Sequence, residues 1–182
     1  ISSLHKSVRG SDPDASLYWL ARMLTGGESP DYIARRLVRM ASEDIGLADP
    51  NALSITIAAW NAYERLGSPE GELALAEAVV YLATAPKSNA IYTAAKKAWK
   101  RAFATSSLSP PKHTLNAPTK LMKDEGYGEG YAYDHDTPEG YSGQTHLPEP
   151  LEGEVYYAPV SRGFEREIER RLAYFARIKA KK

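Results

Sequence analysis

Apolar residues recur every three or four positions through most of the first hundred residues, which is the spacing of a helix with one buried side. The pattern predicts five helices, over residues 13–25, 30–45, 50–66, 69–84 and 88–104. Further along the chain it predicts a short helix over 118–125 and a closing helix over 163–179. We therefore expect an all-α fold of stacked short helices joined by tight turns.

Four of these helices open with the same signal, an acceptor side chain followed by proline. The pairs are Asp12-Pro13, Ser29-Pro30, Asp49-Pro50 and Ser68-Pro69, and Ser88 continues the spacing. The acceptor can cap the first turn, and proline lacks an N–H where the helix offers it no acceptor. A stack of similar helices without a chemical motif is typical of a scaffold or an interaction surface.

The helices over 50–66 and 69–84 are apolar on almost every side. No charged residue lies between Asp49 and Glu64, and the acidic first turn of the second helix is followed by a mainly apolar stretch. A helix that is apolar all round is usually buried on most of its surface. Because this short stack supplies too few neighbours, we expect other copies of the chain to cover the remainder.

The helix over 88–104 has a different pattern. Its apolar stripe, Ile91, Ala95, Ala98, Trp99 and Ala102, is expected to face inward, and its outer face is basic. Residues 110–160 lose periodicity and are rich in Pro, Gly and Tyr, with six tyrosines between 127 and 159. We expect an ordered, irregular wrap there. Residues 1–105 are assigned to a helical oligomerisation core, and 106–182 to the wrap and closing helix, packed on the same domain.

Charge is strongly segregated although 23 basic and 23 acidic residues cancel. Residues 87–123 hold eight basic and no acidic side chains, and residues 124–154 hold nine acidic and no basic ones. These blocks indicate either internal pairing or a polar surface for a partner. A DNA-binding surface that contacts the phosphate backbone would use the basic block, with these candidates: Lys96, Lys97, Lys100, Arg101, Lys120 and Lys123.

Enzymatic motifs are missing from the sequence. There is no cysteine, no Gly-x4-Gly-Lys-Ser/Thr phosphate loop and no Gly-x-Ser-x-Gly nucleophile turn. Asp134-His135-Asp136 with His146 offers metal ligands, but a capped turn with solvated histidines explains these residues better. No apolar run reaches the length of a membrane span. We therefore predict no catalytic, cofactor or metal site within this chain.

The first residues, Leu4 to Asp14, mix cations and carboxylates around a glycine. They fit either a capped helix entrance or a docking surface for whatever precedes Ile1. Because the chain begins with isoleucine, we expect it to be a piece of a larger protein. The docking candidates are His5, Lys6, Arg9, Asp12 and Asp14.

The same opening resembles the replication-associated recombination protein A family (RarA, also called MgsA). The matching segments are His5-Lys6-Ser7-Val8-Arg9-Gly10-Ser11-Asp12-Pro13-Asp14-Ala15, residues 17–23, Ala41-Ser42-Glu43-Asp44-Ile45-Gly46-Leu47-Ala48-Asp49-Pro50, Ala85-Pro86-Lys87-Ser88-Asn89-Ala90, Asn116-Ala117-Pro118-Thr119-Lys120-Leu121-Met122-Lys123, Tyr156-Tyr157, Pro159, Arg162-Gly163 and Glu165. These segments run in order through nearly the whole chain.

The resemblance implies the C-terminal helical region of AAA+ ATPases related to clamp loaders, which act at stalled or damaged replication forks, in recombination and in repair. It implies a collar-like fold, assembly into a homotetramer and a cytoplasmic, nucleoid-associated bacterial protein. It also implies an upstream AAA+ core that uses ATP and magnesium, and contacts of the parent protein with DNA forks or ends and single-stranded DNA-binding protein. The core's nucleotide motifs are absent here, so ATP turnover is expected of the parent and not of this chain.

Overall fold

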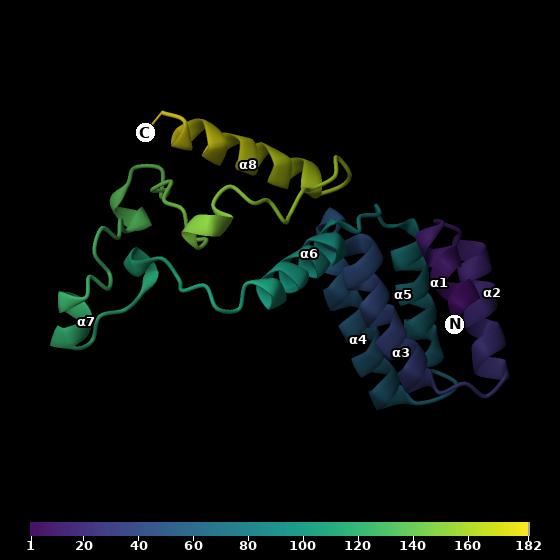
Figure 1. The fold of residues 1–182 in the computed structure, drawn as a ribbon. Coiled ribbons are helices and arrows are strands. Elements are labelled where there is room, and N and C mark those ends of the chain that lie inside the picture. Colours follow the sequence, from purple (N-terminus) through teal and green to yellow (C-terminus); the bar gives the residue numbers. More distant parts are fainter. Residues whose placement is uncertain (182) are drawn as a thin grey trace. The chain divides into compact units, whose positions relative to one another are not determined.

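The computed structural model describes residues 1–181, and this part of the chain is helical without a β-strand (Figure 1). This confirms the predicted all-α class. Its α-helices are α1 (Ser2–Arg9), α2 (Pro13–Thr25), α3 (Pro30–Met40), α4 (Asn51–Leu66), α5 (Glu72–Thr84), α6 (Ala90–Ala104), α7 (Lys120–Asp124) and α8 (Glu165–Lys179).

The capping signals set several of these boundaries. The Asp12 side chain accepts a hydrogen bond from Ala15 N (2.9 Å), and α2 begins at the next residue, Pro13. In the same way, the Ser29 hydroxyl accepts a hydrogen bond from Tyr32 N, and α3 begins at Pro30. The Ser68-Pro69 prediction is wrong by three residues, because residues 69–71 form turns and α5 begins only at Glu72. A π-helical turn, Ala41–Ile45, and a 3-10 turn, Gly46–Ala48, replace the predicted end of the second helix.

The chain divides into two compact units. Unit 1 comprises residues 1–96 and 157–169, and unit 2 comprises residues 97–156 together with the chain from 170 onwards. In unit 1, α1 to α5 pack on one another as a helical bundle (Figure 1). Its core is formed by large side chains that are almost completely buried: Leu4, Val8, Ile33, Leu37, Met40, Ile45, Leu75, Val79 and Leu82.

Helix α1 is an element that the periodicity did not predict. It is only eight residues long, yet Leu4 and Val8, four residues apart, are both fully buried in the core of unit 1. The segment expected to be a capped helix entrance or a docking surface therefore contributes a helix to the bundle.

Helices α4 and α5 are buried in part and exposed in part. Helix α4 buries Ala52, Thr56 and Ala59 and leaves Leu53 and Ile57 exposed. Helix α5 buries one broad face and leaves Leu73 76% exposed. The bundle thus leaves apolar side chains of both helices at its surface, as expected for two helices with too few neighbours.

The predicted inner face of α6 is wrong. The buried residues of this helix are Ala90 and Ala94, whereas Trp99 and Phe103 are 72% and 89% exposed. An apolar stripe becomes buried only where another element packs on it, and no described segment covers these two aromatic side chains.

Unit 2 is built largely from turns. Between α6 and α8 it contains 3-10 turns at Lys112–Thr114, Asp134–Asp136 and Glu149–Leu151, together with α7. Local hydrogen bonds order it, including Lys112 Nζ to Glu125 O (2.8 Å) and Gly128 N to Lys112 O (2.8 Å). The expectation of an ordered but irregular segment is confirmed.

Candidate functional site

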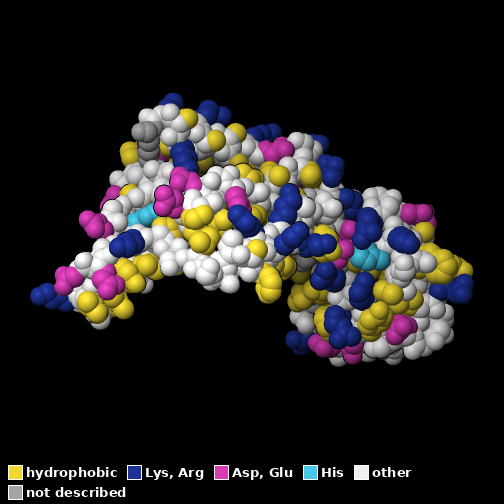
Figure 2. Space-filling model, in the orientation of Figure 1, with side chains coloured by type: hydrophobic (Ala, Val, Ile, Leu, Met, Phe, Trp, Pro, Cys, Tyr) yellow, Lys and Arg dark blue, Asp and Glu magenta, His cyan; other side chains and the backbone are white. Residues whose placement is uncertain are grey.

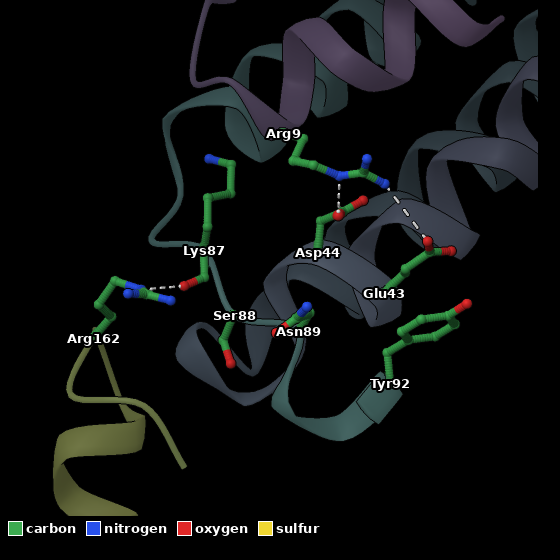
Figure 3. A pocket seen from close by; sticks show the side chains of 8 residues that line it. All are labelled: Arg9, Glu43, Asp44, Lys87, Ser88, Asn89, Tyr92 and Arg162. Carbon is green, nitrogen blue, oxygen red and sulfur yellow. Dashed lines mark hydrogen bonds and ion pairs between the residues drawn. The ribbon is translucent and has the colours of Figure 1, made fainter. Parts of the chain in front are cut away.

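A charged cleft in unit 1 gathers several of the segments that carry the family resemblance (Figure 3). It has a volume of about 430 Å³ and lies where α1, the π-helical turn, the start of α6 and the chain before α8 meet. Its lining residues are Arg9, Glu43, Asp44, Lys87, Ser88, Asn89, Tyr92 and Arg162. Residues as distant in the sequence as Arg9 and Arg162 therefore share one site.

Asp44 is the centre of an ion-pair network at this site. Its carboxylate accepts from Arg9 Nε (2.7 Å) and contacts His5 Nε2 (2.5 Å), and its side chain is only 6% exposed. His5 and Arg9 are about one helical turn apart on α1, so both reach the same acid. The hydrogen bond to Asp44 raises the pKa of the Arg9 guanidinium above its usual range. The network fastens α1 to the π-helical turn.

Glu43 joins this network from the neighbouring position. It accepts from Arg39 Nε (2.8 Å), as the i,i+4 spacing predicts, and lies 3.6 Å from Arg9 Nη2. Both carboxylates in the cleft are therefore paired with guanidinium groups.

Lys87 turns its ammonium away from the centre of the cleft (Figure 3). Lys87 Nζ donates to Ala83 O (3.0 Å) and Ala85 O (2.5 Å), at the C-terminus of α5, where helix carbonyls lack partners. Burial lowers the pKa of this ammonium. Its backbone carbonyl accepts from Arg162 Nε (2.7 Å). This residue therefore joins the end of α5 to the segment before α8.

His5, Glu43 and Asp44 form the one group of three potential metal ligands that lie within 4.8 Å of one another among residues 1–181. Arg9 already contacts both carboxylates, so a divalent cation would meet a fixed positive charge. The geometry is that of an ion-pair network. The alternative cluster considered from the sequence, Asp134-His135-Asp136 with His146, does not assemble: Asp134 instead accepts from Ser142 N, which lowers its pKa.

The five candidate docking residues divide into two groups. His5 and Arg9 face Asp44, and Asp12 caps α2, so these three are used within the chain. Lys6 is exposed, and Asp14 is exposed in the first turn of α2. The structure thus explains three of these residues by internal contacts, and docking to an upstream core stays a prediction.

The candidate DNA-contacting residues lie on two helices. Lys96, Lys97 and Lys100 are exposed on α6, whereas Lys120 and Lys123 are exposed on α7. Arg101 differs from them because its Nη2 lies 2.7 Å from the Glu154 Oε1 carboxylate oxygen. This contact is one ion pair between the basic and acidic blocks.

Apolar surface is the feature that the sequence reasoning located least well. Leu17, Ala21 and Leu24 share one side of α2 with the buried Leu20, yet they also line an open groove against α5 together with Leu73. The apolar periodicity of α2 indicates which of its side chains lie on one side of the helix. It does not show whether another element covers that side. Figure 2 shows hydrophobic side chains at the surface of the bundle, and others beside basic side chains over α6.

These observations define a class of protein. Helices α1 to α5 form a bundle with a paired charge network and exposed apolar side chains, which are features of an accessory helical domain. None of its described helices is long and apolar enough to cross a membrane.

The comparisons with known proteins place the chain within a family. The family model described as "MgsA AAA+ ATPase C terminal" matches residues 10–176, and the chain belongs to this family. It is 56% identical over 179 residues to "Replication-associated recombination protein A" of Coxiella burnetii, a match that covers 98% of the chain and 41% of the relative. The protein of the same description in Escherichia coli strain K12 is 52% identical over 177 residues, covering 97% of the chain and 40% of the relative.

A eukaryotic relative is also similar. "ATPase WRNIP1" of Dictyostelium discoideum is 49% identical over 163 residues, covering 86% of the chain and 18% of the relative. The chain thus spans about two fifths of the length of the bacterial relatives. It is a C-terminal domain of AAA+ ATPases of the RarA/MgsA type.

Proposed function

We propose that this domain is the self-association module of its parent ATPase and holds four copies together. The observation that carries the proposal is the apolar surface of unit 1: Leu53 and Ile57 on α4, Leu73 on α5, and the groove between α2 and α5. Contiguous exposed apolar surface on a folded domain usually marks an interaction site. Covering it with another copy removes that surface from water.

The proposal extends to the parent protein. A tetramer of this domain would hold four upstream AAA+ cores near one another, and the cores would bind ATP and magnesium. The family supports a role in replication-associated recombination, and we place the parent at damaged or stalled replication forks, in contact with DNA ends and single-stranded DNA-binding protein. We propose a cytoplasmic, nucleoid-associated location for it.

Light scattering coupled to size-exclusion chromatography tests self-association directly. We expect the isolated chain to elute as a tetramer at tens of micromolar protein. A monomer at that concentration would contradict the proposal. Leu73→Glu should lower the measured mass because it places a carboxylate on the apolar surface of α5, whereas Leu121→Glu, a similarly exposed leucine on α7, is the matched control.

DNA binding by the basic block 87–123 is a second candidate function. One observation favours it: Trp99 and Phe103 are exposed on the same helix as Lys96 and Lys100, and exposed aromatic rings beside cations suit stacking on unpaired bases. Fluorescence anisotropy with forked and single-stranded DNA over a salt series tests it. Affinity that falls steeply with salt would support it, and no binding at low salt would remove it.

A further inference from the structure

The hollow between α2 and α5 is an open apolar groove on unit 1. It consists of two adjoining hollows of about 640 and 440 Å³ that share Leu17, Leu73 and Ala76. Among its described lining residues, the charged ones are Glu72 and Glu77, and both are acidic. We call this surface the α2–α5 groove. Its floor suits an apolar side chain, and its acidic residues suit a basic neighbour.

The outer half of α6 has the opposite character. Trp99 and Phe103 are four residues apart, so they lie on one stripe of the helix, and they are 72% and 89% exposed. Lys96 and Lys100 are exposed beside them, and α6 contains no acidic residue. We call this surface the α6 ridge. Two large aromatic side chains here can be buried by a partner that also offers negative charge.

The charges of the acidic groove and the basic ridge favour some pairings between copies over others. Two grooves placed face to face would bring glutamates together, and two ridges would bring lysines together, so either symmetric pairing sets like charges opposite each other. A ridge against a groove places Lys96 and Lys100 near Glu72 and Glu77 and covers apolar surface on both sides. Interfaces favour buried aromatic anchors seated in a pocket and ringed by polar residues.

We propose that the α6 ridge of one copy docks in the α2–α5 groove of a second copy, with Trp99 and Phe103 seated on Leu17, Leu73 and Ala76. The inference rests on the proposed self-association and names its contact surfaces. Because the ridge and the groove are different surfaces, every copy can give one ridge and receive one, either reciprocally about a two-fold axis or in sequence from copy to copy. When the rotation between neighbours closes, such a contact forms a ring.

Site-specific cross-linking tests the contact, because the sequence contains no cysteine. Leu73→Cys and Phe103→Cys chains, carrying different tags, are co-expressed and treated with a short bismaleimide. Both positions are highly exposed, so the substitutions leave the core intact. We expect a cross-link between the two kinds of chain, and little product when either variant is treated alone.

The outcomes separate this inference from the proposed function. A tetramer that yields no mixed cross-link, or yields Phe103→Cys paired with itself, overturns the ridge-in-groove contact and leaves self-association standing. A monomer overturns both.

Charge reversal gives a second, independent test. Glu77→Lys and Lys100→Glu should each weaken association about tenfold, because each places like charges across the contact. The double variant should restore association to within about threefold of the original chain, since the pair is re-formed with reversed polarity. Circular dichroism confirms folding of each exposed-site variant.

DNA binding by the same ridge predicts a different result. Lys100→Glu would then weaken binding to single-stranded DNA while Glu77→Lys changed neither DNA binding nor the oligomer, and the double variant would restore nothing. That pattern overturns the inference.

Discussion

At the scale of single residues, the structure concentrates its buried charge on Asp44. The side chain is almost inaccessible to water, and its two oxygens contact His5 and Arg9 on α1. A buried carboxylate of this kind is stabilised only by its partners, since burial without them is costly. The same residue's backbone carbonyl accepts from Ser88 N (2.8 Å), so Asp44 connects three separate segments.

Replacing Asp44 by asparagine should destabilise unit 1. The substitution keeps the size of the side chain but removes the charge that Arg9 and His5 face, and we expect a loss of roughly 2–3 kcal/mol in the free energy of unfolding. Urea denaturation measures it. Glu64→Gln, at an exposed position of α4, should change stability by less than about 0.5 kcal/mol. Equal effects of the two variants would refute a central role for the network.

The pair of Arg101 and Glu154 makes a prediction about pH. The hydrogen bond from Arg101, followed by that from Tyr156, lowers the pKa of the Glu154 carboxyl in the folded chain. A lowered folded-state pKa gives stability that is present above the unfolded-state pKa and is lost as the pH falls through the folded-state value.

The difference in Tm between the original chain and Glu154→Gln should therefore be largest near about pH 7 and should shrink as the pH falls below about 4, the ordinary pKa of a glutamate, towards the lowered folded-state pKa. Thermal unfolding followed by circular dichroism over a pH series measures this. A difference that stays constant with pH would show that the ion pair contributes nothing. Glu152→Gln, on an exposed neighbour, should show no such trend.

At the scale of elements, α1 is a helix that is stabilised by packing and that the periodicity of its own residues does not predict. Eight residues are too few for a stable isolated helix in water. Helix α1 nevertheless packs against α2 and α5, and its Leu4 and Val8 complete the core. Burial of these side chains, together with the contacts of His5 and Arg9, holds the element in place.

Truncating Leu4 should therefore release α1. We expect Leu4→Ala to lower the free energy of unfolding by about 2–5 kcal/mol, the range for large-to-small changes in a core. Lys6→Ala, on the exposed side of the same helix, should have little effect. Hydrogen exchange gives the local readout, since amides of α1 should lose protection in the first variant and keep it in the second. Unchanged protection in Leu4→Ala would refute this account of α1.

At the scale of the whole molecule, unit 1 is completed by a segment from near the end of the chain. Gly163 has φ +55°, and a Cβ there would lie 2.1 Å from Ala48 O and 2.7 Å from Pro86 Cγ. Phe164 N donates to the same Ala48 carbonyl (2.8 Å), and Arg162 donates to Lys87 O. The close approach of two backbones at this position requires a residue without a side chain.

A methyl group at residue 163 should separate these backbones. Gly163→Ala is expected to cost roughly 2–4 kcal/mol, because steric overlap adds to the penalty for a positive φ. Gly67→Ala is the matched control for the penalty of a positive φ alone. Gly67 has φ +68°, but a Cβ there would meet nothing within 4 Å. This substitution should therefore cost only about 1 kcal/mol in the free energy of unfolding. Denaturant unfolding of both variants checks the difference, and equal costs would argue against a tight contact.

The helices were largely predictable because their information is local. The bounds of α2 and α4 were predicted to within one residue. The prediction used helical periodicity, capping side chains and the glycines that end each helix. The Arg39–Glu43 ion pair is local in the same sense, because its two residues are four positions apart on one helical face. The failures at α1 and at the buried face of α6 share one cause: each was decided by what packs on the segment, and periodicity does not contain that information.

By itself, the sequence determined that this chain is helical, that it lacks a phosphate-binding loop, and that two of its helices are too apolar for a small bundle to cover. Only the tertiary structure decided that Arg9, Asp44, Lys87 and Arg162 share one cleft, and that Trp99 faces outward. The physical reason is distance along the chain. Capping and amphipathicity act within a turn or two of helix, whereas ion pairs and exposed faces depend on which distant segments the fold brings together.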